Sequence, residues 1–201
     1  MKFLALIMLL PNLAFAQTWD FNVLMDDKPL GQHRFELSES GLERTLTSEA
    51  SFKIQLLFIT AYKYQHSARE KWQGDCLVYL DAKTEEKGVT TLVKGQSRTG
   101  GFELESPART LPGCVMTFAY WNSNMLTQSK LLNPQTGEWV DVNISKIGTE
   151  TLQVRGQNVP TERYSLKSKM LKIDLWYSKE GKWLALKSTT PEGHVITYEL
   201  K

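Results

Sequence analysis

Short runs of alternating apolar and polar residues follow one another along almost the whole chain after residue 17. The runs are rich in Val, Ile, Thr, Tyr, Phe and Trp, the residue types that strands favour. Most of the Gly-, Pro-, Asn- and Asp-containing gaps are long enough for a hairpin but too short for a helix, so consecutive strands are expected to pair antiparallel. These turn clusters lie at 26–29, 39–41, 73–75, 85–88, 99–101, 133–137, 180–181 and 191–193.

One hairpin can be placed in register from this pattern. A three-residue loop at 73–75 puts the apolar positions of residues 62–72 and 76–83 on one face, whereas a two-residue loop mixes apolar with charged positions. We therefore predict the three-residue loop. The inward face then carries Tyr62, Tyr64, His66, Ala68, Glu70, Trp72, Cys76, Val78, Leu80 and Ala82.

The last part of the chain repeats this regularity. Turns at 180–181 and 191–193 join three predicted strands, and the first of them sets Asp174 opposite Lys187 on the wet face, a favourable cross-strand pair. The residues expected to share the apolar face are Leu171, Ile173, Leu175, Tyr177, Leu184, Leu186, Ile196, Tyr198 and Leu200.

Together these elements predict a mainly β protein with a single domain over residues 17–201. The preferred architecture is a single antiparallel curved sheet, a half-barrel or open barrel, with a concave and partly apolar face. A closed barrel and a sandwich remain alternatives, because a sheet of so many strands must curl, close or fold into two layers. The main interruption is a short helix or irregular crossover near 121–132.

Residues 1–16 are typical of a cleavable secretory signal peptide. Lys2 precedes an apolar stretch at 3–10, a breaker at Pro11, and an Ala-x-Ala ending at 14–16. The apolar stretch is far shorter than the roughly 20 residues of a membrane-spanning helix. We expect cleavage after Ala16, export, and a mature chain without a transmembrane segment. No cysteine follows the cleavage site, which argues against a lipid anchor.

Charge and cysteine content narrow the picture further. With 24 Lys and Arg against 22 Asp and Glu, the formal net charge is +2, which gives no electrostatic reason to expect nucleic acid as a partner. The two cysteines, Cys76 and Cys114, would reach a compartment where disulfides persist. A bridge between them closes a loop of about 38 residues and stabilises the fold by roughly 4 kcal/mol in the chain-entropy model. Two separate buried thiols are the alternative.

The inward stripe Tyr62, Tyr64, His66, Glu70 and Trp72 is the first candidate site. Buried carboxylates are rare unless they are paired or hydrogen-bonded. In the simplest interpretation these side chains find partners on neighbouring strands and complete the core; lining a ligand site is the alternative. His66 and Glu70 lie about 13 Å apart along a strand and cannot form a catalytic dyad. Desolvation should raise the pKa of Glu70 unless a cation meets it.

Tyr120 and Trp121, just before the irregular stretch, are the second candidate. Aromatic side chains at the mouth of a curved sheet can hold apolar ligands, or they can plug the end of the core. The histidines at 33, 66 and 194 show no metal-binding spacing, and the chain has no Gly-x-Ser-x-Gly, P-loop or dinucleotide motif. We therefore predict no metal, no cofactor and no catalytic residue, and favour a protein that is not an enzyme.

Several of these segments resemble a known family. They are residues 57–64 with His66, Glu70, Trp72 and Gly74, then 120–122, 132–137, and 175–181 with Tyr198. The combination resembles exported bacterial proteins that are classified only as a domain of unknown function, the 6134 type. The resemblance implies the periplasm of a Gram-negative bacterium and no established activity. In architecture the fold is similar to the half-barrels of periplasmic lipoprotein carriers, and fold alone does not give function.

These observations favour an exported envelope protein that binds an apolar or amphipathic, lipid-like molecule on a concave sheet. The tyrosines, histidine, carboxylate and tryptophans named above would line that site. A protein–protein interaction module of the envelope, using a sheet edge or the Trp121 loop, is the alternative. An enzyme with Glu70 as acid or base is the third hypothesis.

Overall fold

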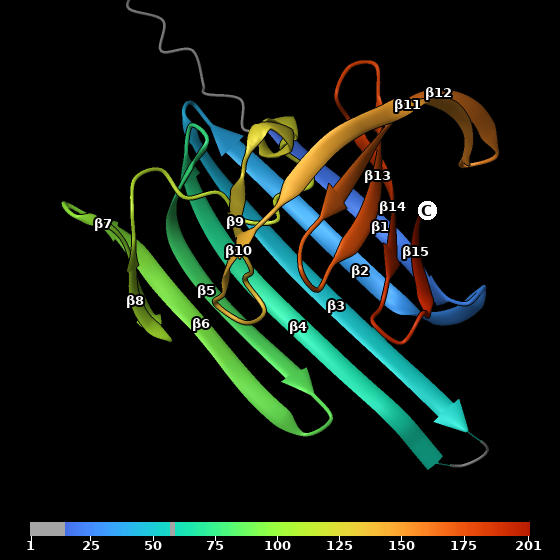
Figure 1. Cartoon of the computed structure of the whole chain (residues 1–201), viewed down its shortest axis with the longest axis horizontal. Helices are drawn as coiled ribbons and strands as arrows, with labels where there is room; N and C mark the ends of the chain where they lie inside the picture. The colour runs from blue at the N-terminus through green and yellow to red at the C-terminus, as the bar shows by residue number, and fades with distance from the viewer. Residues whose placement is uncertain (1–14, 57–58) are drawn as a thin grey trace, which may run out of the picture.

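The computed structural model describes residues 15–56 and 59–201, and these form strands almost throughout (Figure 1). Residues 1–14 of the predicted signal peptide, and Leu57 and Phe58 of the family-like segment, lie outside the described residues. The predicted cleavage point after Ala16 lies within the first strand. The elements are β1 Phe15–Met25, β2 Lys28–Ser40, β3 Glu43–Leu56, β4 Ile59–Gln73, β5 Cys76–Glu86, β6 Val89–Arg98, β7 Gly101–Ser106, β8 Ala108–Leu111, η1 Ser123–Thr127, β9 Lys130–Leu132, β10 Trp139–Asp141, β11 Asn143–Val154, β12 Gln157–Lys167, β13 Lys172–Ser178, β14 Trp183–Thr189 and β15 Val195–Leu200.

Thirteen of these strands form one sheet. Their order is β11-β12-β13-β14-β15-β1-β2-β3-β4-β5-β6-β7-β8, and every neighbouring pair is antiparallel. The two end strands, β8 and β11, do not pair with each other, so the barrel is open. The prediction of a single curved antiparallel sheet is therefore confirmed. β9 and β10 make a separate two-stranded sheet.

The segment 112–142, which we call the plug, connects β8 to β11 and fills the inner side of the sheet. It contains the 3-10 helix η1, so the expected short helix within 121–132 is confirmed. Figure 1 shows η1, β9 and β10 lying across the inner side of the long strands β2 to β5. The apolar side chains of the plug belong to the same core as those of the sheet. The buried ones are Val115, Met116, Ala119, Trp121, Met125, Leu131, Leu132 and Val142.

In the β4–β5 hairpin most side chains lie on the predicted face, but the turn and the register next to it differ from the prediction. Gln73 pairs with Cys76 across a two-residue turn, so the predicted three-residue loop is wrong. An irregularity in the ladder next to Trp72 then restores the alternation, and Glu70 faces Leu80. As a result Leu77 is buried in the core and Val78, predicted to point inward, is only half-buried. A β-bulge has the effect of one extra residue, which turns the following side chains to the other face.

A second bulge changes one position in the C-terminal strands. The register shifts next to Tyr177, so Trp183 enters the core where Leu184 was predicted. The predicted pairing of Asp174 with Lys187 is confirmed. Ile196, Tyr198 and Leu200 pack against the core as expected.

Candidate ligand-binding site

The predicted stripe follows the inner side of β4, but its two ends differ in burial. Tyr64, His66, Glu70 and Trp72 are at most 7% exposed, whereas Tyr62 is half-buried. All of them alternate with exposed polar residues because successive strand side chains point to opposite faces. The stripe therefore runs from a partly exposed end at Tyr62 to a fully buried end at Trp72.

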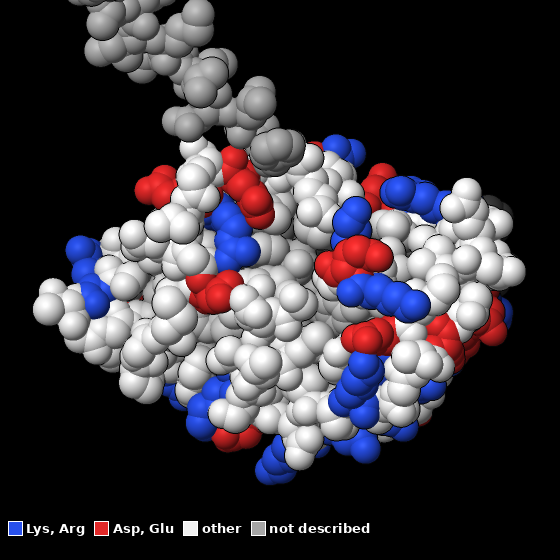
Figure 2. Space-filling view, turned by 90° about the horizontal axis from the view of Figure 1, so that it is seen from above, with Lys and Arg blue, Asp and Glu red and all other residues white. Residues whose placement is uncertain are grey.

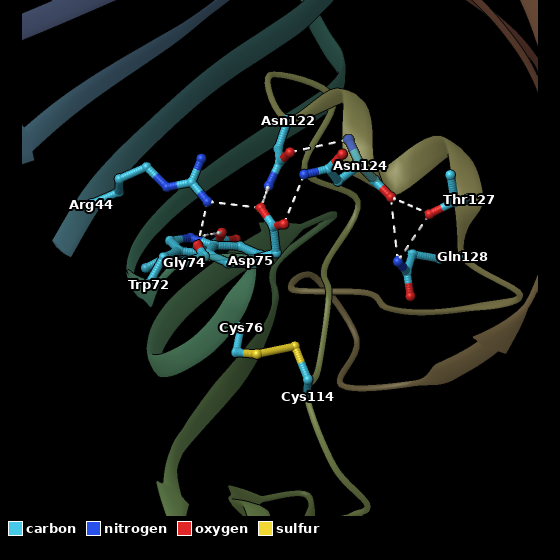
Figure 3. A network of polar contacts seen from close by, with 11 residues as sticks. Arg44, Trp72, Gly74, Asp75, Cys76, Cys114, Asn122, Asn124, Thr127 and Gln128 are labelled. Carbon is cyan, nitrogen blue, oxygen red and sulfur yellow. Dashed lines mark hydrogen bonds and ion pairs between the residues drawn. A yellow bond between two sulfur atoms is a disulfide. The ribbon is translucent and has the colours of Figure 1, made fainter. Parts of the chain in front are cut away.

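At the Trp72 end, the plug closes the interior. The Trp121 ring lies perpendicular to the Trp72 ring, with centroids 5.6 Å apart, and the Arg44 guanidinium lies 4.8 Å from the Trp121 centroid. Arg44 also donates to Asp75, which accepts further hydrogen bonds from Asn122 at 3.0 Å and Asn124 at 2.7 Å (Figure 3). The hydrogen bond from Asn122, more than the neighbouring Arg44, lowers the pKa of Asp75. Trp121 thus helps to close the interior at this end, which we call the seal, and it does not face solvent.

A disulfide reinforces this seal. Cys76, at the start of β5, is bonded to Cys114, near the start of the plug, and the two Cα atoms lie 4.8 Å apart (Figure 3). Beside it, the backbone N–H of Leu77 donates to the carbonyl of Val115 at 2.9 Å. The bridged alternative for the two cysteines is thus the one found in the structure.

Glu70 lies beneath the plug. One of its carboxylate oxygens accepts hydrogen bonds from Trp72 Nε1 at 3.1 Å and from the Thr117 hydroxyl of the plug at 3.2 Å. Burial raises the pKa of Glu70 to about 7, against the lowering effect of these two hydrogen bonds. Among the residues that the structure describes, no basic side chain forms an ion pair with it. The raised pKa confirms the sequence-based prediction, and this carboxyl is enclosed, with 3% of its surface exposed.

His66 is also tied to the plug through a short polar chain. Its Nδ1 lies 2.9 Å from the Thr84 hydroxyl on β5, and that hydroxyl donates to the carbonyl of Gln135 in the plug at 3.4 Å. Burial lowers the pKa of His66 to about 4, so the imidazole is neutral at pH 7. His66 thus completes the core and helps to attach the plug.

The structure reveals a histidine contact that the sequence analysis missed. His33 Nε2 lies 2.8 Å from the Ser48 hydroxyl, and His33 Nδ1 lies 3.1 Å from the Tyr198 hydroxyl. A serine next to an oriented histidine resembles a nucleophilic pair. However, burial lowers the pKa of His33 to about 3, and Ser48 is only 5% exposed. Such a weak base beside an enclosed hydroxyl is suited to linking β15, β2 and β3 rather than to catalysis.

Four tyrosines on the inner side of the sheet and in the plug form the second group of interest, and we call them the tyrosine cluster: Tyr62, Tyr64, Tyr120 and Tyr198. The neighbouring phenols Tyr62, Tyr64 and Tyr120 contribute to the raised pKa of Tyr198, and Tyr120 contributes to that of Tyr64. Desolvation is the largest cause of the raised pKa of each; for Tyr62 it is helped by Glu86 and gives a pKa of about 12. The phenols are therefore neutral at pH 7.

The hydroxyls of the tyrosine cluster are only partly engaged. Tyr62 donates to Glu86 at 3.3 Å, and Tyr198 is bonded to His33. Within the described parts of the chain, the hydroxyls of Tyr64 and Tyr120 have no hydrogen-bond partner. Their rings are well packed: Tyr64 stacks on Phe52 with centroids 5.1 Å apart, and Tyr120 lies 5.3 Å from the Trp183 ring. The cluster therefore offers apolar ring surface together with two unused hydroxyls.

In Figure 2, basic and acidic side chains are interspersed on the face in view. For residues 15–56 and 59–201, there is no group of three or more potential metal ligands, and no helix is both long and apolar enough to span a membrane. The predicted absence of a metal stays a prediction.

Comparisons with known proteins agree with this architecture. No curated protein is detectably similar in sequence. In fold the chain is similar to a beta-barrel-like protein of domain of unknown function DUF1849 from Brucella abortus, with a TM-score of 0.70 at 8% sequence identity. The likeness covers 96% of this chain and 97% of that one. At this identity it concerns the fold alone. Residues 21–201 match the family described as domain of unknown function DUF6134, and the chain belongs to that family.

Proposed function

We propose that this protein is a non-enzymatic component of the bacterial envelope that binds an amphipathic, lipid-like molecule at the tyrosine cluster. The observation that carries the proposal is the contrast in burial along the inner side of β4. The Trp72 end is closed by the plug, whereas at the other end the Tyr62 ring is half-buried, and the Tyr64 and Tyr120 hydroxyls have no hydrogen-bond partner in the described part of the chain. Of the predicted stripe, only Tyr62 and Tyr64 then line the proposed site. Tyr120 and Tyr198 complete it.

The chemistry of the cluster selects for a molecule with both apolar and polar parts. Neutral phenols provide apolar ring faces and hydroxyl groups that donate or accept hydrogen bonds. Lys87 Nζ lies 5.8 Å from the Tyr62 ring centroid, and Glu86 bonds the Tyr62 hydroxyl, so charge of both signs stands at the rim. An acyl chain against the rings, with a polar head group near Lys87 and Glu86, matches this arrangement.

The envelope location rests on separate observations. The first sixteen residues have the pattern of a secretory signal peptide, and the chain carries a disulfide of the kind that persists outside the cytoplasm. The nearly balanced charge argues against a nucleic-acid partner. Periplasmic binding of a lipid-like molecule is consistent with all three.

A direct test is displacement of the fluorescent apolar probe 1-N-phenylnaphthylamine by palmitate. The wild-type chain should bind the probe and release it to palmitate. Removing one half-buried ring in Tyr62→Ala or Tyr120→Ala should weaken binding about tenfold, because burial of an aromatic side chain contributes about 1.5–3 kcal/mol.

Tyr79→Ala provides the matched control. Tyr79 is a half-buried tyrosine on β5, but it lies opposite Lys71 on the wet face and its ring contacts that lysine. Its removal should leave probe binding unchanged. If the probe does not bind, or if all three variants lose affinity equally, the tyrosine cluster is not the binding site.

A further inference from the structure

A groove of about 420 Å³ is lined partly by the plug, and none of its lining residues belongs to the tyrosine cluster. It is bounded by β8, β10 and the turn between β12 and β13. Its apolar part consists of half-buried Trp139, Val140 and Leu171 together with Met170, which is 65% exposed. An exposed methionine beside a half-buried tryptophan gives the groove an adaptable apolar wall.

The backbone of β10 points unused hydrogen-bonding groups away from its only partner strand. On the side of β9, Asn133 N–H donates to the Glu138 carbonyl and Val142 N–H donates to the Ser129 carbonyl, both at 2.9 Å. Bonded positions alternate along an antiparallel ladder, so residue 140 also faces β9. The N–H and C=O groups of Trp139 and Asp141 therefore point to the opposite edge, where no strand in the described part of the chain pairs with them.

The other side of the groove is also a strand edge. β8 is the last strand of the large sheet, and its Arg109 lines the groove. The two sides are held together near Gly137, where an added Cβ would come within 2.4 Å of Pro107 Cδ. The groove thus lies between two short strands, each with a vacant edge in the described chain.

The charges around the groove are not balanced. Asp141 is neutralised by an ion pair with Lys130 at 2.5 Å. Arg109 and Lys169 form no ion pair with any residue that the structure describes, and Glu138 is the remaining acidic side chain of the lining. The unpaired charge is positive overall, and it favours an occupant that carries acidic groups.

We propose that this groove binds an extended peptide segment of a partner protein, which adds a strand to the edge of β10. Main-chain hydrogen bonds to Trp139 and Asp141 supply affinity, as in other cases of strand addition. An apolar side chain of the peptide packs between Trp139 and Met170, and an acidic side chain meets Arg109 and Lys169. A small apolar molecule would leave the edge-facing backbone groups unused, which is why a peptide is the better fit.

The test uses the full chain and seven-residue peptides selected on it from a displayed random library. Asp141→Pro removes an N–H that points away from β9, and proline is tolerated at strand edges. We expect this variant to bind the selected peptides about tenfold more weakly. Asp141→Ala retains the N–H and loses only the ion pair with Lys130, so it should bind nearly as well as the wild type.

A second measurement on the wild-type chain keeps the test valid even if the proline variant misfolds. In the wild-type chain, ¹⁵N NMR should show the Trp139 and Asp141 amides shifting on peptide addition, and selected peptides should be enriched in acidic and apolar residues. Selection of no peptide with millimolar or better affinity, or shifts confined to other regions, would overturn the proposal. Probe binding at the tyrosine cluster should stay unchanged in both variants, so the two proposals fail separately.

Discussion

The two ends of β4 have the same alternation of side chains but different surroundings. At the Trp72 end, a disulfide, the polar contacts of Asp75 and two packed indoles hold the plug against the sheet. At the other end Tyr62 is half-buried, and the hydroxyls of Tyr64 and Tyr120 have no hydrogen-bond partner among the residues that the structure describes. The difference shows that the course of the plug, more than the residues of the strand, decides which part of an inward-facing stripe is enclosed.

The largest expected effect comes from releasing the plug at the closed end. Replacing both Cys76 and Cys114 by alanine should lower the free energy of unfolding by about 4 kcal/mol, because the bridge restricts a loop of 38 residues in the unfolded chain. Urea denaturation of the variant and of the wild type in reductant should give similar losses. A loss below about 1 kcal/mol in both would show that the polar contacts alone hold the plug.

A smaller and pH-dependent effect is expected for Glu70→Gln. The folded-state pKa of Glu70 is about 7 against an ordinary value of 4.5. Its contribution to stability is therefore fully present below pH 4.5 and is lost as the pH rises through about 7. Glutamine cannot ionise but can still accept hydrogen bonds from Trp72 and Thr117.

Between pH 4 and pH 8, the variant should thus gain on the order of 3 kcal/mol relative to the wild type. The comparison is made by urea denaturation at each pH, so the opposite contributions of His33 and His66 cancel in the difference. A difference that does not change with pH would mean that water or a cation reaches the Glu70 carboxylate, and the closed end would then be open.

The smallest effect on stability is expected at the partly exposed end. Tyr62→Phe removes one hydroxyl that donates to Glu86 at 3.3 Å, and it should change the free energy of unfolding by about 0.5 kcal/mol. Trp72→Phe, which removes the indole donor to Glu70 at the closed end, should cost more. Thermal or urea denaturation of the two variants gives the comparison directly. Equal losses would erase the distinction between the two ends.

Alternation along single strands was enough to predict the stripe on β4 and the curved antiparallel sheet. It also contained the diagonal side-chain contact of His33 with Ser48, since both occupy inward positions of the β2–β3 hairpin, where His33 pairs with Ala50 and Phe35 with Ser48. Because the β2–β3 hairpin was not placed in register from the sequence, this contact was not predicted, although the alternation contained it.

Other features depend on interactions that no local pattern records. Because of the bulge beside Trp72, Leu77 occupies the core in place of the predicted Val78. Because of the bulge beside Tyr177, Trp183 occupies it in place of Leu184. A bulge is decided by packing against the next strand, and the turn sequence alone does not specify it. The plug has apolar residues without a period of two or 3.6, so its place against Glu70 and Trp72 emerges only from the tertiary structure.

The pairing of β1 with β15 has a consequence for when this protein can fold. β1 lies in the middle of the sheet, with β2 on one side and β15 on the other, and Phe21 is the partner of Leu200. The centre of the sheet therefore stays incomplete until residues near 200 have been synthesised and can pair with β1. Contacts of such sequence separation slow folding. The thirteen-stranded sheet of this protein is therefore completed only when its first and last strands meet, and loss of β15 would leave an edge of β1 unpaired at the centre of the sheet.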